Sequence, residues 1–169
     1  MSTSSQNPLN PPVSKEAKPA PKRSLTPRRR AREYALQGVY QSLVMRRAGS
    51  IPNAAAIAKQ LAEDPAFRRC QLELFQGIFD GVLVRTDELE AIITPALDRP
   101  INELSPVEHA ALLIGAYELA VDLSVPYKVA INEAVELAKT FGGTDGHKYV
   151  NGVLDLLAQK LRTAETQAG

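Results

Sequence analysis

The chain has 169 residues, of which 44% are hydrophobic and 23% charged, and this composition is typical of a globular protein with one domain. The single cysteine, Cys70, excludes an internal disulfide framework and a multi-cysteine zinc site, and no apolar run approaches the length of about 18 residues that a transmembrane helix needs. Aromatic residues make up only 5% of the chain, which favours helices over a β-sandwich or barrel. The N-terminus lacks the apolar core of a signal peptide, so we expect a cytoplasmic protein.

The net charge of +1 hides an uneven distribution of charge along the chain. Residues 1–32 hold eight basic residues and one acidic residue, which gives this segment a charge of +7. Residues 33–169 hold 12 basic and 18 acidic residues, which gives them a charge of −6. A basic segment on a mildly acidic body favours a polyanionic partner, such as a nucleic acid, that binds at one place.

Residues 1–26 contain five of the 12 prolines and few apolar residues, so we predict a disordered tail. Thr26 and Pro27 then have the pattern of an N-cap and a first helical residue, and apolar residues recur at helical spacing as far as residue 47. The first turns of this helix carry four arginines: Arg28, Arg29, Arg30 and Arg32. Because cations at a helix N-terminus oppose the helix dipole, the cluster is easier to understand if an anion binds nearby.

Three more helices are predicted before residue 100. The first is short and covers residues 54–63. An aspartate and a proline at residues 64–65 begin a long helix that reaches about residue 85, with Cys70 on its apolar stripe. Within it, Gly77 and Gly81 share one face and permit close contact with another helix. Thr86 and the residue after it cap the third helix, which reaches about residue 97.

The clearest local signal is at residues 105–108, where Ser105 and Glu108 form the pattern of a capping box around Pro106. The helix that follows, to about residue 122, is apolar nearly all round, which is typical of a central core helix. Two further helices are predicted, one ending at about residue 141 and one capped near residue 145 and reaching about residue 161. With about seven helices and no convincing strand pattern, the fold class is all-α, with a single domain over residues 27–165.

The sequence offers no constellation of residues for catalysis. His109 and His147 have no partners at the spacing of a metal site, and a lone cysteine on an apolar stripe is typical of an inert thiol. The glycine-rich residues 142–148 lack the pattern of a phosphate-binding P-loop, although free amides at a helix start beside Lys148 suit a phosphate of a larger ligand. We therefore predict a protein that is not an enzyme and has no metal or cofactor. Its arginines suit single-stranded RNA, because a guanidinium contacts phosphates and stacks on bases.

Two segments of the sequence resemble the NusB family of bacterial transcription antitermination factors. The run VPYKVAINEAVELAKTFG at residues 125–142 and the run HKYVNGVLD at residues 147–155 resemble the C-terminal signature of the family. The run RRRARE at residues 28–33, with Gln37 and Tyr40, resembles its opening helix. The resemblance covers roughly residues 28–162, and residues 1–26 resemble an extension that the family does not require.

The resemblance implies an all-helical protein of two packed bundles that binds the boxA element of ribosomal RNA leader transcripts. It implies two protein partners, the ribosomal protein NusE and an RNA polymerase antitermination complex. By position, it implies RNA contacts at Arg28, Arg29, Arg30, Arg32, Tyr40 and Lys148. It also implies that Glu108 and Tyr40 bind NusE, and that the loop of Asp145, Gly146 and His147 lies close to the RNA. At Asn102 this chain departs from the family, which often has an acidic residue there.

Several alternatives stay open at this point. NusB-like domains also occur fused to ribosomal RNA methyltransferases, which requires a cofactor domain after residue 162. A protein-interaction module, in which the arginines only keep the protein soluble, fits the charge pattern as well. Glu108 has a second interpretation as the partner in a capping box, and Tyr40 as an aromatic residue that packs between helices.

Overall fold

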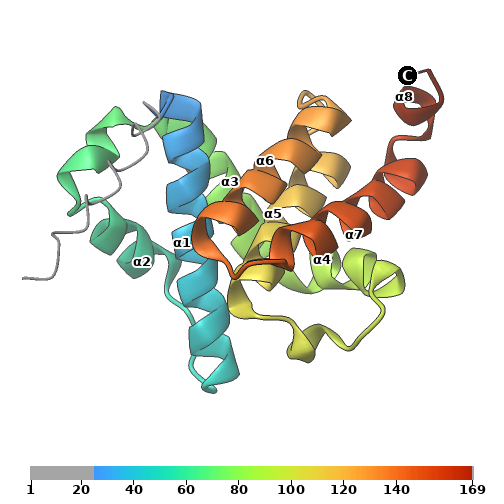
Figure 1. The fold of residues 1–169 in the computed structure, drawn as a ribbon. Coiled ribbons are helices and arrows are strands. Elements are labelled where there is room, and N and C mark those ends of the chain that lie inside the picture. The colour runs from blue at the N-terminus through green and yellow to red at the C-terminus, as the bar shows by residue number, and fades with distance from the viewer. Residues whose placement is uncertain (1–24, 169) are drawn as a thin grey trace, which may run out of the picture.

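The computed structural model describes residues 25–168, and within this range the chain forms helices and no strand, which confirms the predicted all-α fold (Figure 1). The predicted tail lies outside the described residues, except for its last two. The α-helices are α1 (Pro27–Arg47), α2 (Ala54–Leu61), α3 (Leu72–Val84), α4 (Thr86–Ile93), α5 (Pro106–Ala120), α6 (Tyr127–Phe141), α7 (Gly146–Leu161) and α8 (Thr163–Ala168). Three 3-10 helices lie between them, namely η1 (Pro65–Arg69), η2 (Thr94–Ala96) and η3 (Ile101–Glu103).

Capping interactions place the ends of α1 and the start of α5 where the sequence predicts them. Thr26 Oγ1 accepts a hydrogen bond of 3.1 Å from the N–H of Arg29. Ser105 and Glu108 make both hydrogen bonds of the capping box, each 3.2 Å long. After α1, Gly49 has a φ of 81°, in the left-handed region that glycine adopts without strain. Local sequence alone therefore determines these helix ends.

The long helix predicted from residue 65 to about residue 85 is wrong as a single element, because the chain breaks between η1 and α3. Contacts with α1 stabilise the break. The N–H of Gln71 donates to the carbonyl of Pro27 at 2.9 Å, and Phe67 packs edge-on against Tyr34 with ring centroids 5.0 Å apart. Cys70 is half-buried at this break, so it does not lie on a helical stripe.

Two other helix starts and the C-terminal end differ from the predictions. Thr86 is the first residue of α4, where its hydroxyl donates to the carbonyl of Val82 at 3.0 Å and caps nothing. Asp145 precedes α7, but its side chain makes no capping hydrogen bond. The short helix α8 follows Arg162 and was not predicted.

The two glycines of α3 have different surroundings. A Cβ at Gly81 would collide with the ring of Tyr117 on α5, so this glycine permits the close contact that the sequence predicts. A Cβ at Gly77 would meet no atom within 4 Å, and the predicted close contact is wrong for this residue. Only one of the two positions therefore requires glycine.

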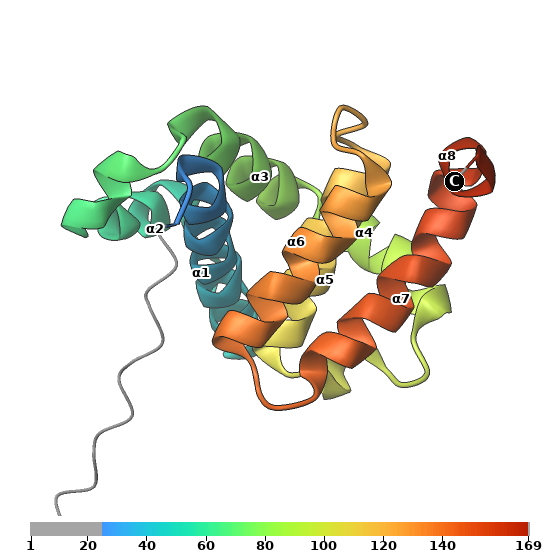
Figure 2. The same ribbon diagram turned by 45° about the horizontal axis from the view of Figure 1, so that its top comes forward.

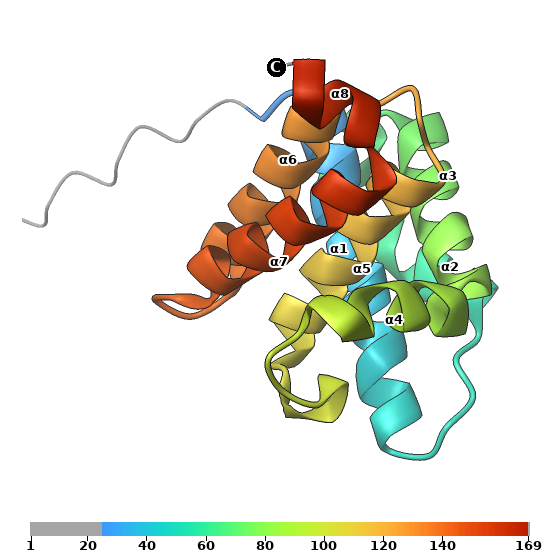
Figure 3. The ribbon, with the colours of Figure 1, turned by 90° about the vertical axis from the view of Figure 1, so that its right-hand side faces the viewer.

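Helix α5 is the centre of the molecule, as its apolar sequence predicts. It packs against α1, α3 and α4 and also against α6 and α7, and its residues Ala110–Ile114 are at most 1% exposed. Figure 2 shows α5 beneath α6, with α1 on one side and α7 on the other, and Figure 3 shows α4 crossing α5. Helices α1 to α3 form one bundle and α4 to α7 form a second, which agrees with the architecture that the resemblance implies. No helix within residues 25–168 is long and apolar enough to cross a membrane.

Candidate nucleic-acid interface

The first turn of α1 combines the features of an anion-binding site. Pro27 begins the helix and is exposed, and the first turn contains no acidic residue. The positive end of the helix dipole therefore lies beside Arg28, Arg29 and Arg30, and the N–H of Arg28 points out of the helix, whereas those of Arg29 and Arg30 donate to Thr26. Arg28 is exposed, whereas Arg29 and Arg30 are half-buried. An anion at this end of α1 relieves the repulsion between the arginines and the dipole.

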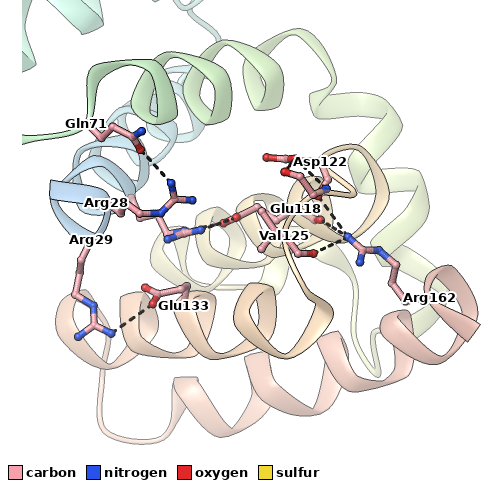
Figure 4. Close-up of polar contacts among 10 residues, drawn as sticks. Arg28, Arg29, Gln71, Glu118, Asp122, Val125, Glu133 and Arg162 are labelled. Carbon is pink, nitrogen blue, oxygen red and sulfur yellow. Dashed lines mark hydrogen bonds and ion pairs between the residues drawn. The ribbon is translucent and has the colours of Figure 1, made fainter. Parts of the chain in front are cut away.

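The side chains of Arg28 and Arg29 make only long polar contacts with the rest of residues 25–168 (Figure 4). Arg28 Nη1 donates to Gln71 Oε1 at 3.3 Å, and Arg29 Nη2 lies 3.4 Å from Glu133 Oε1 on α6. Among residues 25–168, the side chain of Arg30 has no hydrogen-bond or ion-pair partner. Hydrogen bonds of this length are weak, so these guanidinium groups remain available to phosphates.

Arg32 lies in the core and not on the surface. Its Nε and Nη2 donate to the two carboxylate oxygens of Glu118 on α5, at 3.0 and 2.9 Å, and the two side chains are 4% and 1% exposed. Burial by itself lowers the pKa of Arg32, but the hydrogen bond and the charge of Glu118 outweigh it and raise the pKa above its ordinary value. The sequence interpretation groups Arg32 with the RNA contacts, whereas the structure gives it the role of attaching α1 to α5.

The sequence contains a signal for this burial. Arg32 precedes Leu36, Val39 and Leu43 by four, seven and eleven residues, so it continues their buried stripe on α1. Arg28 precedes Val39 by eleven residues and so lies on the same stripe, but it is exposed in the first turn of the helix. The stripe therefore separates Arg32 from Arg30 but not from Arg28, which lies on the same face one turn nearer the start of the helix.

Two further arginines, Arg68 and Arg69, lie at the same end of the molecule and were not singled out from the sequence. They are the last two residues of η1, and both are exposed. The ends of η1 are held against α1, because the hydroxyl of Tyr34 donates to Asp64 at 2.8 Å before it and Gln71 contacts the first turn of α1 after it. Their only sequence signal is two adjacent arginines, which without these contacts indicates no site.

Glu108 lies between the start of α5 and the start of α7. Its Oε2 accepts the hydrogen bond of the capping box from Ser105, and its Oε1 would lie 2.6 Å from a Cβ added at Gly146. The loop before α7 is thus brought against Glu108. Lys148 and Asp145 are exposed and form an ion pair of 3.5 Å, and His147 is half-buried. The structure therefore brings together Glu108 and the loop that the resemblance places close to the RNA.

Tyr40 lies far along α1 from the arginines. It is 39% exposed and lines a pocket of about 410 Å³. The pocket residues come from α1, α5 and α6: Leu36, Gln37, Tyr40, Gln41, Val107 and Phe141. Twelve helical residues separate Tyr40 from Arg28, which corresponds to about 18 Å along the helix axis. Because Val107 adjoins Glu108, Tyr40 belongs to the end of the molecule that carries Glu108 and the loop before α7.

Apart from the buried Arg32, the predicted site residues therefore form two groups at two ends of the molecule. The first group is the arginine end, made by the start of α1 and by η1. The second is the loop end, made by Tyr40, Glu108 and residues 145–148. A helical fold with an arginine surface at one end and an apolar pocket beside an acidic residue at the other defines an all-helical protein built to bind a polyanion and a second ligand.

Comparison with known proteins identifies the family. Residues 29–159 match the model of the NusB family, and the chain belongs to this family. It is 51% identical over 152 residues to the transcription antitermination protein NusB of Methylobacillus flagellatus, which covers 90% of this chain and 95% of that protein. It is 54% identical over 141 residues to the protein of the same name from Bordetella pertussis, with 83% and 91% covered. These names are those of transcription factors, which confirms the prediction that the chain is not an enzyme.

Solved structures have the same fold. T. maritima NusB superposes with a TM-score of 0.68 at 25% identity, covering 84% of this chain and 98% of that one. The antitermination factors NusB and NusE, crystallised in complex with double-stranded RNA, give a TM-score of 0.68 at 24% identity, covering 78% and 96%. At 24% identity, the similarity to this second structure shows that the fold is shared and no more.

Proposed function

We propose that the chain is a transcription antitermination factor of the cytoplasm that binds the boxA element of ribosomal RNA leader transcripts together with the ribosomal protein NusE. In this proposal the pair then joins an RNA polymerase antitermination complex. The observation that carries it is the first turn of α1, where Arg28, Arg29 and Arg30 lie without strong partners among the described residues. The chain is also 51% identical to a transcription antitermination protein. The relative crystallised with NusE and RNA supports the same partners.

The RNA contacts begin at the arginine end. Arg28, Arg29 and Arg30 each neutralise one phosphate, and the positive end of the α1 dipole adds to this attraction. Arg68 and Arg69 on η1 extend the positive surface beside them. At the loop end, the same strand of RNA contacts Tyr40 and the loop of Asp145, Gly146, His147 and Lys148.

The partner contacts lie at the loop end. The pocket beside Tyr40 exposes apolar surface, since Tyr40 and Phe141 are 39% and 36% exposed, and Glu108 adds a negative charge at its edge. An apolar pocket with a charged rim is the usual anatomy of a protein interface. The charge of −6 on residues 33–169 favours a basic partner such as a ribosomal protein.

Titration of labelled boxA RNA at several salt concentrations, with NusE present, tests the RNA site. Replacing Arg28, Arg29 and Arg30 with alanine should reduce the slope of log K against log salt by about 2 for a single strand and about 3 for a duplex. A matched variant removes three exposed cations elsewhere, Lys59, Arg46 and Lys160, and should leave the slope nearly unchanged. Equal slopes for the wild type and both variants would show that the arginines do not contact phosphate. The alternative of a protein-interaction module with a solubilising arginine segment would then remain.

A pull-down with purified NusE tests the partner site. Glu108→Lys should weaken NusE binding, because it reverses the charge at the edge of the pocket. Ser105→Ala is the matched control, since it removes one hydrogen bond of the same capping box but keeps the charge. If both variants bind NusE equally weakly, Glu108 acts only as a cap and does not touch the partner.

A further inference from the structure

A small cavity opens between the first turn of α1 and the start of α6, beside the arginine end. Its volume is about 240 Å³, and its lining includes Arg28, Arg29 and Arg32 on one side and Pro126, Val129 and Glu133 on the other. Pockets for whole small molecules begin at about 300 Å³, so this cavity suits a single flat group of a larger ligand. In an RNA-binding protein, that group is one base.

One wall of the cavity is apolar and the other is cationic. Pro126 is exposed and Val129 is 40% exposed, so both leave apolar surface uncovered beside charged side chains. Arg28 is also exposed, and its planar guanidinium stacks well on a base. Apolar surface next to a guanidinium plane is a favourable environment for the faces of a base that has left its stack.

Glu133 is the acceptor in this cavity, and it lacks strong partners. Its side chain is 19% exposed, and its one hydrogen bond or ion pair with the other described residues is the 3.4 Å pair with Arg29 (Figure 4). An ionised carboxylate has about four lone-pair sites and donates no hydrogen bond. Glu133 therefore offers accepting oxygens to a ligand that carries N–H donors.

Buried polar contacts hold both walls of the cavity in place. The buried pair of Arg32 and Glu118 fixes the start of α1 on α5. Arg162, at the end of α7, donates to the carbonyls of Val125 at 3.0 Å and Glu118 at 3.0 Å, which fixes the linker between α5 and α6 (Figure 4). A cavity with rigid walls binds its ligand without the cost of ordering them.

We propose that this cavity is a base-recognition pocket that takes guanine from a bound RNA strand, with Glu133 accepting hydrogen bonds from its Watson–Crick edge. The inference rests on the proposed RNA-binding function. Guanine presents two adjacent donors, N1–H and the N2 amino group, which match the two oxygens of a carboxylate. Adenine and cytosine place an acceptor nitrogen beside their amino group, and uracil places a carbonyl on each side of its N–H. Arg29 then releases Glu133 and binds the neighbouring phosphate.

Seven-nucleotide RNAs that differ only in the central base, with uridine on both sides, test the proposal by fluorescence anisotropy with the full chain. The strand with guanine should bind at least about tenfold more tightly than the strand with inosine, which lacks the N2 amino group. The affinity for the guanine strand should exceed the affinity for the adenine strand by a similar factor or more. Glu133→Gln should abolish the preference for guanine, because glutamine replaces one acceptor with a donor.

Glu136→Gln is the matched control, because it removes the same charge one turn along α6 from a side chain that is 36% exposed and paired with Lys139. It should keep the full preference. Val129→Phe, which fills the cavity, should remove the preference but leave binding to oligouridine unchanged. Equal binding of all strands by the wild type, or a preference that survives in Glu133→Gln, would overturn the pocket alone. Failure of every strand to bind at low salt, with NusE present as well as without it, would instead refute the proposed RNA-binding function.

Discussion

Breaking the buried ion pair between Arg32 and Glu118 should be more damaging than breaking any surface pair of similar geometry. The two side chains are 4% and 1% exposed and are joined by hydrogen bonds of 3.0 and 2.9 Å. Glu118→Ala leaves the guanidinium charged and buried without a partner, which costs about 3–5 kcal/mol in comparable cases. For a chain of this size the melting temperature should fall by roughly 10 °C.

The assay is urea denaturation followed by far-ultraviolet circular dichroism. Asp87→Ala is the matched control, because the Arg46–Asp87 pair is also 2.9 Å long but its side chains are 38% and 88% exposed. This variant should unfold almost as the wild type does, since surface pairs are screened by water. If Glu118→Ala and Asp87→Ala lose equal stability, the argument from burial is refuted.

The double variant Arg32→Met with Glu118→Leu separates structure from RNA binding. It removes both charges and keeps the volume, so it should recover most of the stability that Glu118→Ala loses. Its slope of log K against log salt for RNA should equal that of the wild type, because the charge of Arg32 is already paired with both carboxylate oxygens of Glu118. A reduced slope would return Arg32 to the set of RNA contacts.

Two further outcomes follow from packing and from titration. Gly81→Ala should destabilise the protein by about 1–3 kcal/mol in thermal unfolding because its Cβ meets the ring of Tyr117, whereas Gly77→Ala should stabilise it by about 0.5–1 kcal/mol. Burial lowers the pKa of His109 below its ordinary 6.5 even though Glu90 opposes this, so the unfolded state takes up a proton first. The free energy of unfolding should therefore fall as the pH drops past 6.5, and His109→Gln should weaken this dependence in urea titrations. A wild-type stability that rises on acidification over that range would contradict the assignment of His109 as a buried neutral base.

The sequence predicts the helices well where the signals are local. The caps at Thr26 and Ser105 are contained within three residues of chain, so α1 and α5 begin where expected. The break between η1 and α3 depends on Gln71 donating to Pro27, 44 residues earlier in the chain. No pattern within residues 65–85 contains that bond, and a continuous helix was the natural prediction.

The candidate site is predicted in its residues but not in its arrangement. Arg28, Tyr40 and Glu108 follow from composition and from the resemblance, yet their division into two ends depends on how α1 lies across α5 and α6. The burial of Arg32 depends on Glu118, 86 residues away. The guanine pocket needs Glu133 of α6 beside Arg29 of α1, 104 residues apart, and neither residue alone indicates it.

Arg162 gives the arginine end a dependence on a part of the chain that is synthesised long after α1. Its guanidinium donates hydrogen bonds to four carbonyls some 40 positions earlier in the chain, at the end of α5 and in the linker after it. They belong to Glu118, Leu119, Asp122 and Val125. Carbonyls at a helix C-terminus have no partner within the helix, so this arginine replaces water there. Because a chain leaves the ribosome N-terminus first, α1 emerges long before Arg162, which fixes the end of α5 and the linker beside the start of α1. A nascent chain therefore carries its arginines well before it can present them in their final geometry.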